Sequence, residues 1–235
     1  MTAEQLARAQ QLDWHGSDDA DQQAEVVARY ILAQLRDAID QRGQASLALS
    51  GGRGPERFLR RLDQAEIDWD KVTITQVDER WVPPAHEQSN AGLIQRCMPQ
   101  ALTQATWLPM YQGKSLQADA HYCHSLLAPL QPLDVVVLGM GPDGHTASLF
   151  PHMPNLAEHL SEQTQDLCIA VPEEGERLAR LSMTAAVINR ARCKLLVLNG
   201  EDKQAQLATA LDTGDALKLP IAAFLTPPMA IFYSP

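Results

Sequence analysis

The sequence predicts an α/β fold in which a mainly parallel β-sheet is flanked by helices, within a single domain spanning residues 1–235. Three observations predict this. Strand-like and helix-like segments alternate along the chain, and the best strands are short, continuous apolar runs typical of strands buried on both faces. In addition, no repeat or linker-like segment divides the chain. A content of 45% hydrophobic and 20% charged residues excludes a mainly disordered or fibrous protein.

After a polar leader, the first half of the chain contains two predicted strands. Residues 45–50 (ASLALS) form an apolar run that ends at a pair of glycines, and residues 72–77 (VTITQV) are β-branched. The predicted helices extend from Asp18 or Asp19 to about Arg42, with Gly43 as the stop, and onward from Pro55, with Phe58, Leu59 and Leu62 on one face.

The second half continues the alternation. We predict helices after Ser89 or Asn90 through Met98, over Leu116–Leu127, near Ser182–Arg190 and after Gly200. We predict strands at residues 134–138 (DVVVL), 167–171, 194–198 and 231–233. Ligands in such folds bind where strands end and helices begin, so the strand-end loops are the places to search for function.

The charge balance constrains the partners of this chain. Nineteen Lys and Arg against 29 Asp and Glu give a net charge of −10, which excludes a general nucleic-acid binder and requires any anion to bind in a local pocket. No leader with a signal pattern and no apolar run of about 18 residues is present, and the four cysteines lack a C-x-x-C pair. We therefore expect a cytoplasmic protein with reduced thiols and no membrane contact.

His121 and His124 share a helix, but no second ligand cluster completes a metal site.

The first strand-end loop is Ser50-Gly51-Gly52-Arg53-Gly54-Pro55. Glycines allow backbone N–H groups to approach an anion, the following helix contributes its positive N-terminus, and Arg53 adds a fork of donors suited to phosphate. The alternative is a tight strand-to-helix turn with an incidental surface arginine.

The second loop places Asp78, Glu79 and Arg80 at the end of a strand. These residues can form a clamp for a substrate. The alternative is a solvated cluster of ion pairs, which is the more common role of a bare charge run.

The third loop, residues 139–146 (GMGPDGHT), follows the most apolar strand. It matches G-x-G-x-x-G, but the following segment lacks the strand and acidic residue of a dinucleotide site, and His145 stands where a phosphate-binding loop needs lysine. His145 is the best general base in the chain, and Asp143 can orient it or bind a substrate hydroxyl, with Gly144 as a further substrate contact. The alternative for His145 is a structural histidine at a helix start.

Together these loops resemble the 6-phosphogluconolactonase family, whose wider superfamily includes glucosamine-6-phosphate isomerase/deaminase. The matching stretches are residues 49–55 (LSGGRGP), 77–90 (VDERWVPPAHEQSN), 137–151 (VLGMGPDGHTASLFP), 177–198 around RLSMTAAVINRA, and 199–203 (NGEDK). The resemblance implies a Rossmann-like doubly wound fold and hydrolysis of 6-phospho-D-glucono-1,5-lactone in the oxidative pentose phosphate pathway. It also implies a catalytic role for His145, no required metal or cofactor, and a monomer or homodimer. Lys203 is a further candidate for binding the phosphate.

Two features separate the possible activities. The isomerase/deaminase branch carries a Glu a few residues after the histidine, whereas Ser148, Leu149 and Phe150 follow here, as in the lactonase branch. The first loop departs from the G-G-S-T-P pattern of the family, because Arg53 and Gly54 replace the hydroxyl-bearing residues. An isomerase/deaminase and a non-catalytic sugar-phosphate sensor are the alternative functions.

Overall fold

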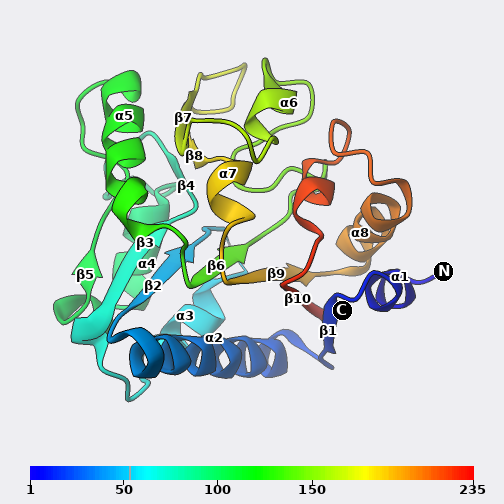
Figure 1. Cartoon of the computed structure of the whole chain (residues 1–235), viewed down its shortest axis with the longest axis horizontal. Helices are drawn as coiled ribbons and strands as arrows, with labels where there is room; N and C mark the ends of the chain where they lie inside the picture. The colour runs from blue at the N-terminus through cyan, green and yellow to red at the C-terminus, as the bar shows by residue number, and fades with distance from the viewer. Residues whose placement is uncertain (53) are drawn as a thin grey trace.

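The computed structural model describes residues 1–52 and 54–235 and contains a seven-stranded sheet in which every neighbouring pair of strands is parallel (Figure 1). In spatial order the strands are β1 (Asp13–Gly16), β10 (Met229–Ser234), β9 (Cys193–Asn199), β6 (Val135–Leu138), β2 (Ala45–Leu49), β3 (Val72–Gln76) and β5 (Thr106–Trp107). The prediction of a mainly parallel sheet flanked by helices is confirmed.

Helices cover both faces of this sheet and form two apolar cores (Figure 1). One core includes residues of α2 (Ala20–Arg42), α3 (Glu56–Asp63) and α4 (Asn90–Cys97). The other includes residues of α1 (Ala3–Ala9), α5 (Leu116–Leu127), α6 (Leu156–His159), α7 (Ala185–Ile188) and α8 (Glu201–Thr213). Among the described residues, no helix is both long and apolar enough to cross a membrane.

The ends of α2 show how local sequence sets the elements. Asp19 caps the helix, because its Oδ1 accepts the backbone N–H groups of Asp21 at 2.9 Å and Gln22 at 2.8 Å. Gly43 ends it with a left-handed φ of 77°, which glycine adopts without steric cost. Both ends agree with the prediction from the sequence.

The order of the strands creates a topological switch point between β2 and β6. From β2 the chain proceeds outward to β3 and β5, whereas from β6 it proceeds outward in the opposite direction to β9 and β10. The connections at the carboxyl ends of β2 and β6 therefore diverge and leave a crevice, the usual ligand site of an open parallel sheet. The two glycine-rich loops predicted from the sequence leave these two strands.

A second, antiparallel sheet lies beside the first and corrects the sequence prediction. It consists of β4 (Asp78–Arg80), β8 (Arg180–Met183) and β7 (Cys168–Val171), with β8 in the centre. The predicted helix near Ser182–Arg190 is confirmed only at α7, because Ser182 and Met183 belong to β8, which pairs with both neighbouring strands. The polar leader also contains α1 and β1, two elements that the sequence pattern did not predict.

One lysine is buried inside the main sheet. Lys194 in β9 has 0% exposure, and its Nζ donates to Asn189 Oδ1 and Thr226 Oγ1, both at 3.0 Å. Burial lowers the pKa of Lys194 to about 8 from its ordinary value of 10.5.

Candidate active site

A cavity of about 460 Å³ lies at the switch point, within the usual size range of small-molecule sites. All three predicted loops contribute to its wall. The contributions of these loops are Ser50, Gly51, Gly52 and Gly54 after β2; Asp78 and Arg80 in β4; and Gly139, Met140, Gly141, His145, Thr146 and Ala147 after β6. The remaining polar side chains of the wall are Gln23, Arg57, Asn90, Arg180, Asn199 and Lys203.

His145 and Asp143 form a hydrogen-bonded pair. Asp143 Oδ1 lies 2.5 Å from His145 Nδ1 and also accepts the backbone N–H of His145 at 3.2 Å. Partial burial alone would raise the pKa of Asp143, but the hydrogen bond and charge of His145 outweigh burial and lower this pKa. An ionised Asp143 assigns the proton to Nδ1 of neutral His145, so Nε2 carries a lone pair. Within the described part of the chain, Nε2 has no hydrogen-bond partner, which leaves it available to a ligand.

The glycine loop after β2 brings backbone and helix termini to the cavity. Gly51 packs so closely on Asn90 that a Cβ would lie 1.7 Å from Asn90 Oδ1, and Gly52 has a φ of 102° that favours glycine. The N-terminal ends of α2, α3 and α8 contribute Ala20, Pro55 and Lys203 to the wall. Helix N-termini attract anions, so this end of the cavity suits a phosphate.

Arg53, which the sequence predicts to contact phosphate, lies outside the residues that the structure describes. Lys203 lies at the cavity, as predicted, and burial lowers the pKa of its ammonium group.

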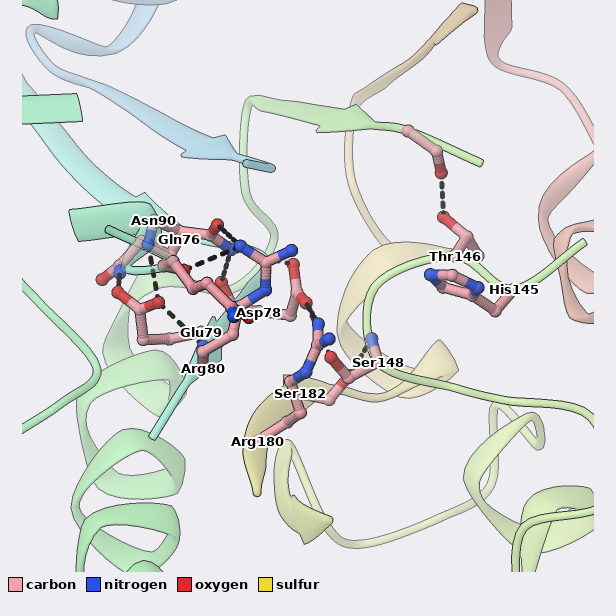
Figure 2. A network of polar contacts seen from close by, with 12 residues as sticks. Gln76, Asp78, Glu79, Arg80, Asn90, His145, Thr146, Ser148, Arg180 and Ser182 are labelled. Carbon is pink, nitrogen blue, oxygen red and sulfur yellow. Dashed lines mark hydrogen bonds and ion pairs between the residues drawn. The ribbon is translucent and has the colours of Figure 1, made fainter. Parts of the chain in front are cut away.

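Arg80 and Arg180 present guanidinium groups to the cavity from adjacent strands of the small sheet, where they are direct cross-strand partners (Figure 2). Arg80 Nη1 donates to the Gln88 carbonyl at 2.7 Å and to Asn90 Oδ1 at 2.9 Å. Arg180 lies 3.7 Å from Asp78 Oδ2, and burial lowers the pKa of its guanidinium group. Asp78 also accepts a hydrogen bond of 2.6 Å from Ser148 Oγ, so its carboxylate is held within the protein.

Three buried polar groups on the wall have no partner among the described residues. They are Ser50 Oγ, Arg80 Nε and Arg180 Nε. Buried donors without partners are costly, so their presence here indicates a polar ligand that completes them.

Glu79 does not belong to the cavity, although the sequence analysis grouped it with a possible clamp. Its side chain has 0% exposure, and its carboxylate accepts five hydrogen bonds. The donors are the backbone N–H groups of Arg80, Asn90 and Ala91, Gln76 Nε2 and Ser89 Oγ. Burial raises the pKa of Glu79 to about 7 against the effect of these donors. Glu79 instead ties the N-terminus of α4 to β4 (Figure 2).

Gly144 is likewise a structural residue. It adopts a φ of 75°, and a Cβ here would lie 2.5 Å from Leu219 Cδ2. Its N–H donates to the Gly141 carbonyl at 3.1 Å, and its carbonyl accepts the N–H of Ile221 at 2.9 Å. Both backbone groups are thus used within the protein, and Gly144 shapes the turn that presents His145.

Sequence reasoning assigned no role to Arg180 or Asn90. Arg180 begins an Arg-Leu-Ser-Met alternation, of which only Ser182 and Met183 fall in the helix predicted near Ser182–Arg190. Asn90 was considered as a helix cap, whereas the cap is Ser89 and the Asn90 side chain holds Arg80. The strand alternation was the available signal for Arg180, because it places Arg180 and Ser182 on one face of a short strand.

The cavity concentrates positive charge in an acidic protein. Arg57, Arg80, Arg180 and Lys203 line it, against Asp78 as the one carboxylate among the described lining residues, in agreement with the expected local pocket for an anion. No cluster of three or more His, Cys, Asp or Glu in residues 1–52 and 54–235 is arranged to hold a metal ion.

Comparisons with known proteins identify relatives over nearly the whole chain. A family model described as glucosamine-6-phosphate isomerases/6-phosphogluconolactonase matches residues 18–230. The chain is 40% identical over 222 residues to a 6-phosphogluconolactonase of Pseudomonas aeruginosa, covering 92% of each protein. It is 39% identical to a 6-phosphogluconolactonase of Mesorhizobium japonicum over the full length of both. A crystal structure of a 6-phosphogluconolactonase from Shewanella baltica is similar with a TM-score of 0.90 and 33% identity, covering 95% of this chain and 98% of that one.

Proposed function

The chain belongs to the family of glucosamine-6-phosphate isomerases and 6-phosphogluconolactonases, and from this premise we propose that it hydrolyses 6-phospho-D-glucono-1,5-lactone to 6-phospho-D-gluconate. The observation that carries the proposal is the Asp143–His145 pair, in which His145 lines a cationic cavity and its Nε2 has no hydrogen-bond partner among the described residues. The proposed partner is thus a small sugar-phosphate lactone of the oxidative pentose phosphate pathway. We extend the proposal to a cytoplasmic monomer or homodimer that requires no cofactor.

In the proposed reaction, water attacks the lactone carbonyl directly. Neutral His145 removes a proton from the attacking water through Nε2, while Asp143 holds Nδ1–H and stabilises the imidazolium that forms. The imidazolium then protonates the ring oxygen as the ester bond breaks, which opens the lactone to the acid. General base assistance of this kind contributes roughly 10²–10⁴-fold to the rate.

Arg180 is the proposed stabiliser of the developing oxyanion. Its guanidinium lies 5.6 Å from the ring centre of Phe150, which in turn contacts His145, so Arg180 is the cavity arginine linked to the base through one side chain. Its Nε is buried without a partner among the described residues. A desolvated donor aimed at developing charge is stronger than the same donor in water.

The phosphate is proposed to bind at the other end of the cavity. Gly51, Gly52 and the helix N-termini supply backbone donors there, and Arg80 lies close by through Asn90, which contacts both Gly51 and Arg80. Lys203 adds a second cation. Binding energy from this remote group positions the carbonyl at His145. For Arg53 the proposal from the sequence stands, and Arg53→Ala is expected to raise KM.

The test generates 6-phosphogluconolactone in situ and follows acid release with wild type, His145→Ala and a blank without enzyme. The blank is essential because the lactone also hydrolyses spontaneously. Acceleration by wild type that His145→Ala abolishes supports the proposal and its base. If folded wild type does not exceed the blank, the lactonase proposal is wrong. A parallel assay with glucosamine 6-phosphate, scored for fructose 6-phosphate and ammonia, tests the isomerase/deaminase alternative.

A further inference from the structure

The His145 ring is enclosed by three groups of its own loop, and Asp143 is only one of them. Asp143 fixes Nδ1. Gly141 packs against the Nδ1–Cε1 edge of the imidazole, where a side chain would not fit, because a Cβ on Gly141 would lie 2.1 Å from His145 Cε1 and 2.2 Å from Nδ1. Phe150 packs on the ring itself, with the two ring centres 4.5 Å apart and an interplanar angle of 39°.

The loop takes an unfavourable backbone conformation on its way from His145 to Phe150. Ala147 has a φ of 51°, in the left-handed region that residues other than glycine rarely adopt. This turn is fixed by Thr146, whose Oγ1 donates to the Gly139 carbonyl at 2.8 Å (Figure 2). It is also fixed by the antiparallel pairing of Thr146 with Leu149. Strained backbone persists where the surrounding structure holds it, commonly at functional sites. Here the turn brings Phe150 back to the histidine five residues earlier.

Phe150 is itself held in place. Its side chain is only 8% exposed, and the guanidinium of Arg177 lies over its ring with Cζ 4.2 Å from the centre. Arg177 is in turn paired with Glu174 at 2.9 Å. A buried aromatic ring fixed by a cation presents a rigid surface to His145.

We propose that Phe150 is a positioning residue for the lactonase reaction: its ring restrains the His145 imidazole so that Nε2 faces the cavity while Asp143 holds Nδ1. This inference rests on the proposed function. Hydrogen bonding by Asp143 leaves the imidazole free to tilt about the Nδ1–Oδ1 axis, and the Phe150 ring removes that freedom. Because general base catalysis depends on orientation, the restraint acts on the chemical step rather than on substrate binding.

The kinetic test compares Phe150→Leu and Phe150→Tyr with a matched control. Phe150→Leu keeps apolar volume but loses the flat ring, and it is expected to lower kcat roughly tenfold with KM within about twofold of wild type. Phe150→Tyr keeps the ring and is expected to retain most of kcat. The control is Phe232→Leu, because Phe232 is 1% exposed and stacks on His15 at 4.6 Å in another part of the chain. It is expected to leave kcat and KM unchanged.

A spectroscopic measurement on wild type keeps the proposal testable if Phe150→Leu does not fold. Nuclear Overhauser contacts between the His145 imidazole and the Phe150 ring are expected in solution, and their absence overturns the proposal. A Phe150→Leu enzyme with wild-type kcat also overturns it, as does an equal loss of kcat in Phe232→Leu. A folded wild type without lactonase activity, by contrast, refutes the proposed function before any variant is compared.

Discussion

The buried ammonium group of Lys194 predicts a stability that rises with pH in the alkaline range. The pKa of Lys194 is lowered to about 8 in the folded protein, whereas an unfolded lysine titrates at 10.5. Between these two values the unfolded chain binds this proton and the folded protein does not, so raising the pH over this interval favours the folded state. At about 1.4 kcal/mol for each pKa unit, this lowering makes the folded protein about 3 kcal/mol less stable below pH 8 than it is at high pH.

The perturbation that isolates this contribution is Lys194→Met, which replaces the ammonium group by an apolar side chain of similar length. The free energy of unfolding of wild type minus that of the variant is expected to rise by roughly 2–3 kcal/mol between pH 7 and pH 10. Most of this rise falls above pH 8. Other groups that titrate in this range cancel in the difference, because both proteins carry them.

The assay is urea unfolding followed by tryptophan fluorescence at pH 7, 8, 9 and 10. Lys218→Met serves as the control, because the Lys218 side chain is 78% exposed, and its difference from wild type is expected to stay flat over the same range. A difference for Lys194→Met that is equally flat would refute the assignment of a desolvated ammonium group at this position. A difference that falls with pH would refute the sign of the argument.

The remaining predictions concern the site. Arg180→Met is expected to lower kcat about 10²-fold with a smaller change in KM, whereas Arg80→Met is expected mainly to raise KM. Steady-state kinetics on the phosphorylated lactone measures both constants, and equal effects of the two substitutions would contradict the proposed roles. Gly141→Ala is expected to lower kcat by roughly tenfold, because its methyl group overlaps the restrained His145 ring and displaces it, and full activity of the folded variant would contradict this reasoning. Glu79→Ala leaves three buried backbone N–H groups without an acceptor and is expected to cost more than about 3 kcal/mol of stability by urea unfolding, a loss that a solvated ion-pair cluster would not produce.

Local sequence signals predicted those parts of the fold that depend on local physics. The cap at Asp19, the stop at Gly43 and the apolar strands β2 and β6 were predictable because each follows from residues adjacent in sequence. The elements that were missed depend on distant partners. The strand β8 forms because β4 and β7 pair with it on either side, and the residues Arg180–Met183 do not by themselves predict these partners.

The candidate site shows the same division. The sequence alone identified His145, Asp143 and the glycine loop, because each belongs to a short motif of contiguous residues. Glu79 was misjudged because its burial depends on the N-terminus of α4, which folds back to supply Asn90 and Ala91 as donors. Arg180 was missed because no strand was predicted at Arg180–Met183, whose last two residues fell in a predicted helix.

The cross-strand pair of Arg80 and Arg180 has a consequence for the protein without its ligand. Like charges placed directly opposite in a sheet repel, and here the backbone register fixes them at that spacing with Asp78 as the adjacent carboxylate. The cavity wall at this point therefore carries more positive charge than Asp78 balances. We expect an anion bound between Arg80 and Arg180 to relieve this repulsion and thereby to stabilise the folded protein.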